Sequence, residues 1–157
     1  MKQDRFLIGI LIFIALLVIA ALTLFFVRND VTTNYQPDDT PEGVVYNFAL
    51  AIQRGDVERA YGYLADLDYK PTTAAFTQTV LSGYMDTSAS MEVSDAQVMG
   101  QDAWVTVTLH YMSSGIFDSG WDSTENAMLV LQDGEWKISY MPYPYWSYDW
   151  YVKPYTP

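Results

Sequence analysis

The single histidine of the chain, His110, is the first candidate for acid–base chemistry, because imidazole titrates near neutral pH. It lies in an alternating segment, where Val107 and Leu109 point to one face of a strand and Thr108 and His110 point to the other. The apolar face is expected to pack on a core. His110 is therefore predicted to be a surface or dimer-face residue on the outer side of a sheet, and not a catalytic base.

The residues predicted to point inward include no acidic residue and no histidine. They are Val105, Val107, Leu109, Tyr111, Ala127, Leu129, Leu131, Trp136, Ile138 and Tyr140. Tyrosine, with a pKa of about 10, is a poor base at neutral pH. One histidine and no cysteine give no metal-ligand spacing, and neither a phosphate loop nor a nucleophile elbow is present. We predict no catalytic residue, metal or cofactor, while a carboxylate from a helix could still reach a pocket.

Aromatic residues are the candidates for a ligand pocket, since apolar walls with a few polar tips are how small-ligand sites are often built. The candidate lining residues are Tyr63, Tyr84, Tyr111, Trp136 and Tyr140. The competing interpretation, which the sequence favours, is that these are ordinary core aromatics of a small domain.

The C-terminal segment is unusually aromatic and predicts an interaction surface. Trp146, Tyr148, Trp150 and Val152 alternate as on a strand, bounded by prolines, and this row is expected to be at least partly buried along a sheet edge or across the helices. The opposite row is expected to face solvent. This row comprises Tyr145, Ser147, Asp149 and Tyr151, and it is the predicted contact surface for a protein or a glycan, above all through Tyr145, Asp149 and Tyr151.

The part of the domain that precedes the strands is predicted to be helical, and these helices would position the candidate residues. Thr40 is a predicted N-cap, Pro41 suits the first helical position, and Gly55 ends the segment. Asp56 caps a second helix in the same way. A third helix is predicted after Pro71, with its apolar side formed by Phe76, Val80 and Tyr84.

Strands follow the helices, at about residues 91–100, 103–117, 121–132 and 135–141. The Asp133–Gly134 turn predicts the pairs Leu131–Trp136, Leu129–Ile138 and Ala127–Tyr140. A three-residue loop at Asp118-Ser119-Gly120 predicts Phe117–Trp121, Tyr111–Ala127, Leu109–Leu129 and Val107–Leu131, and a turn at Gln101–Asp102 predicts Val98–Val105. Helices followed by strands indicate an α+β fold with two to three helices on a curved four- to five-stranded antiparallel sheet.

Two stretches resemble one known family. Pro41-Glu42-Gly43-Val44-Val45 through Phe48 and Ala49, then Gly55-Asp56 with Ala60 and Leu64, resemble the opening helices of NTF2-like, cystatin-like cone domains. The hairpin Asp133-Gly134-Glu135-Trp136-Lys137-Ile138 resembles the end of these domains. The resemblance covers about residues 40–141 and implies the fold. It leaves activity open, because the superfamily includes isomerases, dehydratases, transport adaptors and binding domains.

The N-terminal part differs from the rest of the chain. Residues 6–27 form an uncharged apolar run, about 33 Å long as a helix, which matches a hydrocarbon core of about 30 Å. Lys2 and Arg5 predict a cytoplasmic N-terminus. A cleaved signal peptide is the alternative, but signal peptides usually have a shorter apolar region that is followed by a cleavage site with small residues. We predict a transmembrane anchor at 1–28, in the lipid bilayer through 6–27, a linker at 29–39 and an extracytoplasmic domain at 40–157.

Charge excludes one class of partner. From Val31 onward, 17 acidic and 5 basic side chains give a net charge of −12. Such a surface lacks the cations that nucleic-acid phosphates require. The sequence therefore predicts a non-catalytic binding module of the cell envelope, for an envelope protein, a glycan or a small apolar ligand. The alternatives are an isomerase- or dehydratase-type enzyme, favoured if a buried acid lies beside a tyrosine, and a structural subunit that forms a homodimer through the outer sheet face.

Overall fold

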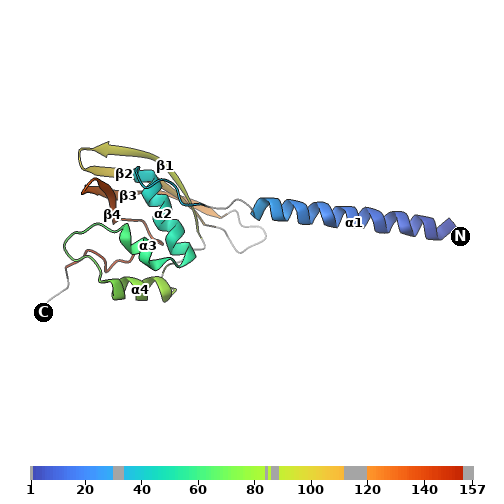
Figure 1. Cartoon of the computed structure of the whole chain (residues 1–157), viewed down its shortest axis with the longest axis horizontal. Helices are drawn as coiled ribbons and strands as arrows, with labels where there is room; N and C mark the ends of the chain where they lie inside the picture. The colour runs from blue at the N-terminus through green and yellow to red at the C-terminus, as the bar shows by residue number, and fades with distance from the viewer. Residues whose placement is uncertain (1, 30–33, 84, 86–88, 112–119, 154–157) are drawn as a thin grey trace. The chain divides into compact units, whose positions relative to one another are not determined.

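The computed structural model describes residues 2–29, 34–83, 85, 89–111 and 120–153 (Figure 1). The chain divides into two units, Met1–Asn34 and Tyr35–Pro157. The second unit begins at Tyr35, so that residues 35–39, which the sequence predicted as part of a linker, belong to the compact part of the chain.

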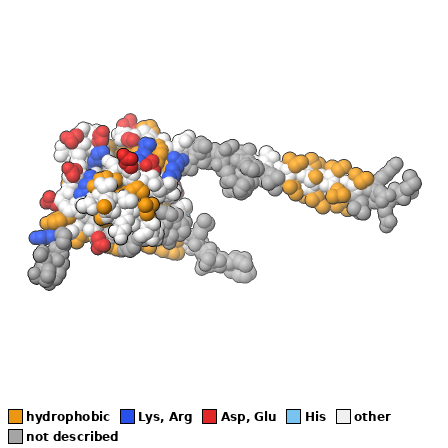
Figure 2. All heavy atoms as spheres, turned by 60° about the horizontal axis from the view of Figure 1, so that its bottom comes forward, with side chains coloured by type: hydrophobic (Ala, Val, Ile, Leu, Met, Phe, Trp, Pro, Cys, Tyr) orange, Lys and Arg blue, Asp and Glu red, His pale blue; other side chains and the backbone are white. Residues whose placement is uncertain are grey.

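The first unit holds one long helix, α1 (Lys2–Asn29). Its described side chains, at residues 8–20 and 23, are exposed and carry no charge (Figure 2). Among the residues that the structure describes, no helix has both the length and the apolar content needed to cross a membrane.

Helix α2 (Pro41–Arg54) begins and ends where the sequence predicts. Thr40 caps it by accepting a hydrogen bond from the Gly43 amide, and Gly55 ends it in the left-handed conformation, at a φ of 68°. Nearly every residue of α2 from Pro41 to Ile52 is buried or half-buried. The helix is therefore covered on more than one side.

Two shorter helices follow. Asp56 caps α3 (Val57–Gly62), and Thr72 caps α4 (Thr73–Leu81). After α3 the chain pairs in parallel with the last strand: the Ile138 amide donates to the Tyr63 carbonyl, and the Ala65 amide donates to the Ile138 carbonyl, both at 2.8 Å. This pairing fixes Tyr63 against the sheet. Tyr84, predicted on the third helix, lies outside the described residues.

The sheet is an antiparallel meander in the order β1-β2-β3-β4. Its strands are β1 (Ser90–Met99), β2 (Asp102–Tyr111), β3 (Trp121–Gln132) and β4 (Glu135–Tyr140), close to the predicted ranges. Figure 1 shows α2 lying across the sheet. The fold class is α+β, as predicted.

The predicted register is confirmed for two of the three pairs of the β3–β4 hairpin and is wrong between the other strands. Leu131 pairs with Trp136, and Leu129 pairs with Ile138, as the Asp133–Gly134 turn predicts. Between β2 and β3, however, Leu109 pairs with Ser123 and not with Leu129, and Tyr111 pairs with Trp121. The register error comes from the assumed three-residue loop at 118–120, because β2 ends at Tyr111. Phe117, Asp118 and Ser119 lie outside the described residues. The displacement is by an even number of residues, so each residue keeps its predicted face.

Two smaller errors have local causes. Val98 pairs with Ala103 instead of Val105, because the first turn is centred on Gly100 and Gln101. Tyr140 pairs with Met128 instead of Ala127, because the ladder is irregular between Met128 and Leu129. A slip of one residue reverses the face of a side chain, and Tyr140, predicted to point inward, is 39% exposed.

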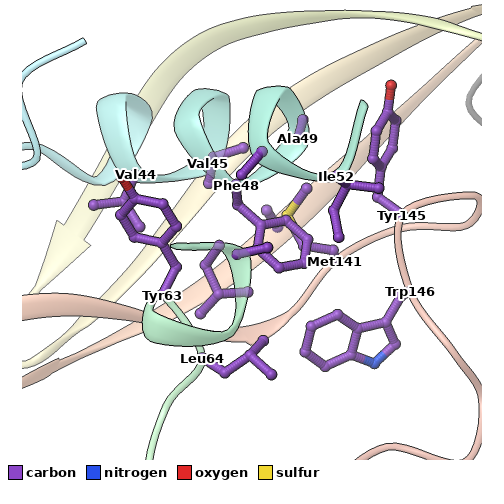
Figure 3. Packing of buried hydrophobic residues seen from close by; sticks show 14 of the residues in the cluster. Val44, Val45, Phe48, Ala49, Ile52, Tyr63, Leu64, Met141, Tyr145 and Trp146 are labelled. Carbon is purple, nitrogen blue, oxygen red and sulfur yellow. The ribbon is translucent and has the colours of Figure 1, made fainter. Parts of the chain in front are cut away.

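The core lies between α2, α3 and one face of the sheet. The predicted inward residues Val105, Val107, Leu109, Ala127, Leu129 and Ile138 are each at most 1% exposed. Figure 3 shows Val45 and Phe48 of α2 with Leu64 and Met141 in this cluster. Tyr111, Leu131 and Trp136 are only half-buried, at the margin of the core.

The C-terminal segment is not the predicted strand. It forms turns around residues 143–144 and 148–151, and Tyr151 has a positive φ of 59°. Tyr145 and Ser147, expected to face solvent, are buried. Tyr148 and Val152, expected to be covered, are 72% and 57% exposed. The alternation fails because a turning backbone does not send successive side chains to opposite faces. Trp146 and Trp150 are buried as predicted.

Candidate ligand-binding cleft

A cleft of about 650 Å³ opens where the N-terminal segment of the compact unit meets α3 and the β3–β4 turn. The lining residues are Pro37, Asp38, Asp39, Val44, Arg59, Gly62, Tyr63, Gly134, Glu135, Trp136 and Lys137. Its size is within the range of small-molecule sites. Two of the predicted pocket residues, Tyr63 and Trp136, are among the lining residues.

Residues 35–39, which we call the strap, form one wall of the cleft. Asn47 of α2, fully buried, holds the strap by accepting from the Gln36 amide and donating to the Gln36 carbonyl, both at 2.7 Å. Its amide nitrogen also donates to Asp38. Gly43 allows the close approach, because a Cβ there would lie 2.2 Å from the Pro37 carbonyl oxygen. The position of Asp38 is thus set by α2.

Three polar side chains meet at the strap. The Tyr63 hydroxyl donates to Asp38 Oδ1 at 2.9 Å and accepts from Arg59 Nε at 3.0 Å. Arg59 also forms an ion pair with Asp38, at 3.7 Å. The arginine is placed one helical turn before Tyr63, and its guanidinium lies 3.5 Å from the centroid of the Tyr35 ring. The triad of Asp38, Arg59 and Tyr63 is a connected network.

The electrostatics of the triad favour a neutral phenol and a permanent cation. Burial raises the pKa of Tyr63, the hydrogen bond from Arg59 lowers it, and the neighbouring Asp38 raises it. The hydrogen bond to Tyr63 raises the pKa of Arg59, with Asp38 adding to the effect. Neither residue is therefore suited to accept a proton at neutral pH.

The opposite wall carries a second charged pair. Lys137 Nζ lies 2.7 Å from Glu135 Oε2 and donates to the Gly62 carbonyl at 3.0 Å. Apolar surface comes from Trp136 and the Pro37 ring. The cleft thus combines an apolar floor with hydrogen-bonding groups already held in place, an arrangement suited to binding and orienting a small molecule. Among the described residues, no group of histidine, aspartate and glutamate side chains is arranged to hold a metal.

Two of the other predicted pocket residues, Tyr111 and Tyr140, lie elsewhere, and Tyr84 is outside the described residues. Tyr111 stacks on Trp121 with ring centroids 4.1 Å apart, and Tyr140 contacts Trp146. Of the predicted contact surface, Asp149 is exposed, but Tyr145 is buried, and the half-buried Tyr151 donates its hydroxyl to the Ala65 carbonyl at 2.6 Å. Burial raises the pKa of Tyr151. The expectation that Tyr145 faces solvent is wrong.

The sequence interpretation missed Asp38, Arg59 and Glu125. Asp38 was assigned to a linker, and nothing in the local pattern shows that Asn47 fixes it. Glu125 could have been found: alternation places it on the face of Ala127 and Leu129, and the structure pairs it with the buried Val107. The predicted absence of a carboxylate from the inward face is therefore wrong.

His110 lies on the outer sheet face, as predicted. Its Nδ1 is 2.8 Å from Asp122 Oδ1 and its Nε2 is 3.5 Å from Glu92 Oε2. The Asp122 hydrogen bond raises the pKa of His110, and Glu92 adds a smaller effect in the same direction. The same face carries the cross-strand pairs Thr106–Asn126 and Thr108–Thr124. His110 is thus part of a polar surface remote from the cleft residues.

Comparison with known proteins yields structural likenesses only. No protein-family model matches the chain, and no curated protein matches it significantly. A provisionally named NTF2-like transpeptidase from Campylobacter jejuni is 18% identical, with 63% of this chain and 96% of that chain covered and a TM-score of 0.43. A provisionally named dehydratase of the NTF2-like family from Streptomyces avermitilis is 15% identical, with coverage of 60% and 86% and a TM-score of 0.41.

A third solved structure, an uncharacterized cystatin-fold protein from Novosphingobium aromaticivorans, is 10% identical, with coverage of 66% and 97% and a TM-score of 0.43. Because these TM-scores are below 0.5, nothing about activity follows from the likenesses. The helices and the four-stranded antiparallel sheet of this chain fit the NTF2-like fold that its sequence motifs predict.

Proposed function

We propose that the compact unit is a non-catalytic binding module that holds a small amphiphilic molecule in the cleft beside Tyr63. The observation that carries the proposal is the network of Asp38, Arg59 and Tyr63, which lies at the wall of a cleft of about 650 Å³. Polar groups fixed before a ligand arrives lose little entropy on binding, so that more of the interaction energy contributes to affinity.

The lining residues indicate the class of ligand. Trp136 and Pro37 offer apolar surface for a small hydrocarbon or ring. The guanidinium of Arg59 still presents donors at the cleft wall, and they suit a carbonyl or carboxylate oxygen. We therefore propose a ligand with an apolar body and one oxygen-rich end.

An enzyme of the isomerase or dehydratase type is the second candidate, and one observation favours it. Asp38 lies 2.9 Å from the Tyr63 hydroxyl, which is the acid beside a tyrosine that this alternative requires. However, the Asp38 side chain is about half exposed, at 50%, and it already receives interactions from Tyr63, Asn47 and Arg59. Its oxygens are thus already occupied by two hydrogen bonds and an ion pair, so that binding is the better-supported role.

We further propose that α1 tethers this module to a membrane, with the compact unit on the non-cytoplasmic side. The support comes from the uncharged run at 6–27 and its basic N-terminal flank. It also comes from the large apolar side chains among residues 8–20, whose exposed fractions lie between 42% and 63%. A helix that is apolar on all sides requires lipid or protein around it.

A ligand screen with a matched pair of variants tests the binding role. The full-length chain, in maltoside micelles, is screened against small amphiphilic acids, ketones and amides by ligand-observed NMR. Tyr63→Phe removes the hydroxyl that joins Arg59 to Asp38 and should weaken a bound compound by about tenfold or more, as loss of one hydrogen bond to a charged group does. Tyr69→Phe removes the hydroxyl of a half-exposed tyrosine outside the cleft and should leave binding unchanged.

Two results would count against the proposal. Equal weakening by both variants would show that binding is not at this cleft. Conversion of a bound compound, lost in Asp38→Asn, would favour the enzyme.

A further inference from the structure

A second, more enclosed hollow lies where β3, the end of β4 and the C-terminal segment meet. Its volume is about 190 Å³, and its lining residues are Glu125, Tyr140, Met141, Tyr143, Trp146 and Tyr148. None of them lines the cleft beside Tyr63. Four of these six residues are aromatic and one carries a carboxylate. We call this hollow the aromatic cage.

The rings of the cage approach one another from different segments. Tyr140 meets Trp146 edge-to-face with centroids 6.1 Å apart, and Tyr143 lies parallel to Tyr148 with centroids 6.4 Å apart. Trp146 is only 7% exposed, and its ring also contacts Phe48, Trp150 and Tyr151. The buried indole therefore forms a fixed wall, while Tyr143 and Tyr148 form an exposed rim.

Glu125 places a negative charge at this hollow. It pairs with Val107 in the sheet and so belongs to the inward face of β3, where it is half-buried. The Ser123 hydroxyl donates a hydrogen bond to Glu125 Oε1, at 3.1 Å. A carboxylate held toward the core side of a sheet needs a cationic or donating partner. No described lysine or arginine lines the hollow.

We propose that the aromatic cage binds a small quaternary ammonium compound. The electron-rich faces of Tyr and Trp attract an alkylated cation, which is weakly hydrated, and Glu125 supplies the opposite charge. The hollow, of about 190 Å³, has room for one trimethylammonium group. The overall charge of −11 also attracts cations and repels anionic ligands.

The test compares choline with 3,3-dimethylbutan-1-ol, a neutral molecule of the same shape. Both are titrated by NMR against the full-length chain in maltoside micelles, which contain no ammonium group. Choline should bind saturably and at least about tenfold more tightly than the alcohol, because only the cation gains from the rings and from Glu125. Equal affinity for the two compounds, or no saturable binding of choline, would overturn the proposal.

Two pairs of variants locate the site. Glu125→Gln should weaken choline binding. Glu58→Gln removes an exposed carboxylate elsewhere and should leave choline binding unchanged. Equal loss of affinity in both variants would indicate general charge attraction and would overturn the proposal. Tyr148→Leu should weaken binding, whereas Tyr148→Phe keeps the ring and should retain it. Because Tyr148 is 72% exposed, both substitutions should leave the melting temperature unchanged. The proposal is independent of the Tyr63 cleft, and Tyr63→Phe should not affect choline.

Discussion

Three tyrosines show how the partner of a hydroxyl group decides the role of a residue. The Tyr63 hydroxyl joins Arg59 and Asp38 at a cleft wall. The Tyr145 hydroxyl is buried between Gln53 and the Ala89 carbonyl, and the Tyr151 hydroxyl contacts the Ala65 carbonyl. The last two residues stabilise the fold, although the sequence pattern placed them on an interaction surface.

Tyr145→Phe should destabilise the domain. Its hydroxyl accepts from Gln53 Nε2 at 2.8 Å and donates to the Ala89 carbonyl at 3.2 Å, inside the core. Removing it leaves the buried Ala89 carbonyl without this donor, at a cost of about 1–3 kcal/mol in the free energy of unfolding. Denaturant unfolding measures the change. Tyr148→Phe, at an exposed tyrosine, is the control, and equal stability of the two variants would show that Tyr145 is not buried in this way.

His110 should make stability depend on pH. Its folded pKa is raised by Asp122 and Glu92, so its ion pairs stabilise the fold fully below the unfolded pKa of about 6.5, and this stabilisation is lost as the pH rises through the folded pKa. The melting temperature should therefore fall between about pH 6 and about pH 8. Because the chain has one histidine, the slope should become shallower in Asp122→Asn. An unchanged slope in this variant would assign the effect to another group.

At the scale of elements, local signals were enough for the helices and the four strands of the sheet, but not for the C-terminal segment. Thr40, Asp56 and Gly55 each act where their side chain or backbone preference predicts. The β2–β3 register was not predictable, because it depends on a connection longer than the assumed turn. The faces were nevertheless correct, since the error was an even number of residues. The cleft could not be predicted, because the strap is held by contacts from Asn47 to Gln36 and Asp38, and no local sequence pattern indicates these contacts.

The strap depends on a glycine in α2. Gly43→Ala adds a Cβ that would lie 2.2 Å from the Pro37 carbonyl oxygen, so that the strap must move. We expect lower stability and faster proteolysis near residue 37, although alanine is the better helix former by about 1 kcal/mol. Gly62→Ala, where nothing lies within 4 Å, is the matched control and should not destabilise the domain. Proteolysis unchanged by Gly43→Ala would mean that the strap does not lie against α2.

At the scale of the whole molecule, the surfaces of the two units differ in polarity. The described side chains of α1 are uncharged, whereas acidic and basic side chains are scattered over the visible face of the compact unit (Figure 2). A tether would confine the binding module to a membrane surface and raise its concentration there. The ligand cleft itself is formed entirely by residues of the compact unit.

The tether predicts that the chain stays in the membrane fraction after an alkaline carbonate wash. Protease added to intact cells should digest the compact unit, since the basic flank keeps the N-terminus inside. Replacing Leu16 and Leu17 with two lysines should release the chain, because each charge at the centre of an apolar helix costs about 2.5–3.5 kcal/mol. Release of the unaltered chain by the wash would contradict the tether.

The most direct test of the binding role follows the cleft and the ligand in one experiment. The full-length chain, labelled in its tyrosine rings, is titrated with the best amphiphilic compound, and the compound is then recovered and analysed. We expect the Tyr63 signal to shift saturably, the Tyr145 signal to stay in place, and the compound to be recovered unchanged. A Tyr63 signal that does not respond while the compound still binds, or a compound recovered as a different molecule, would contradict the account.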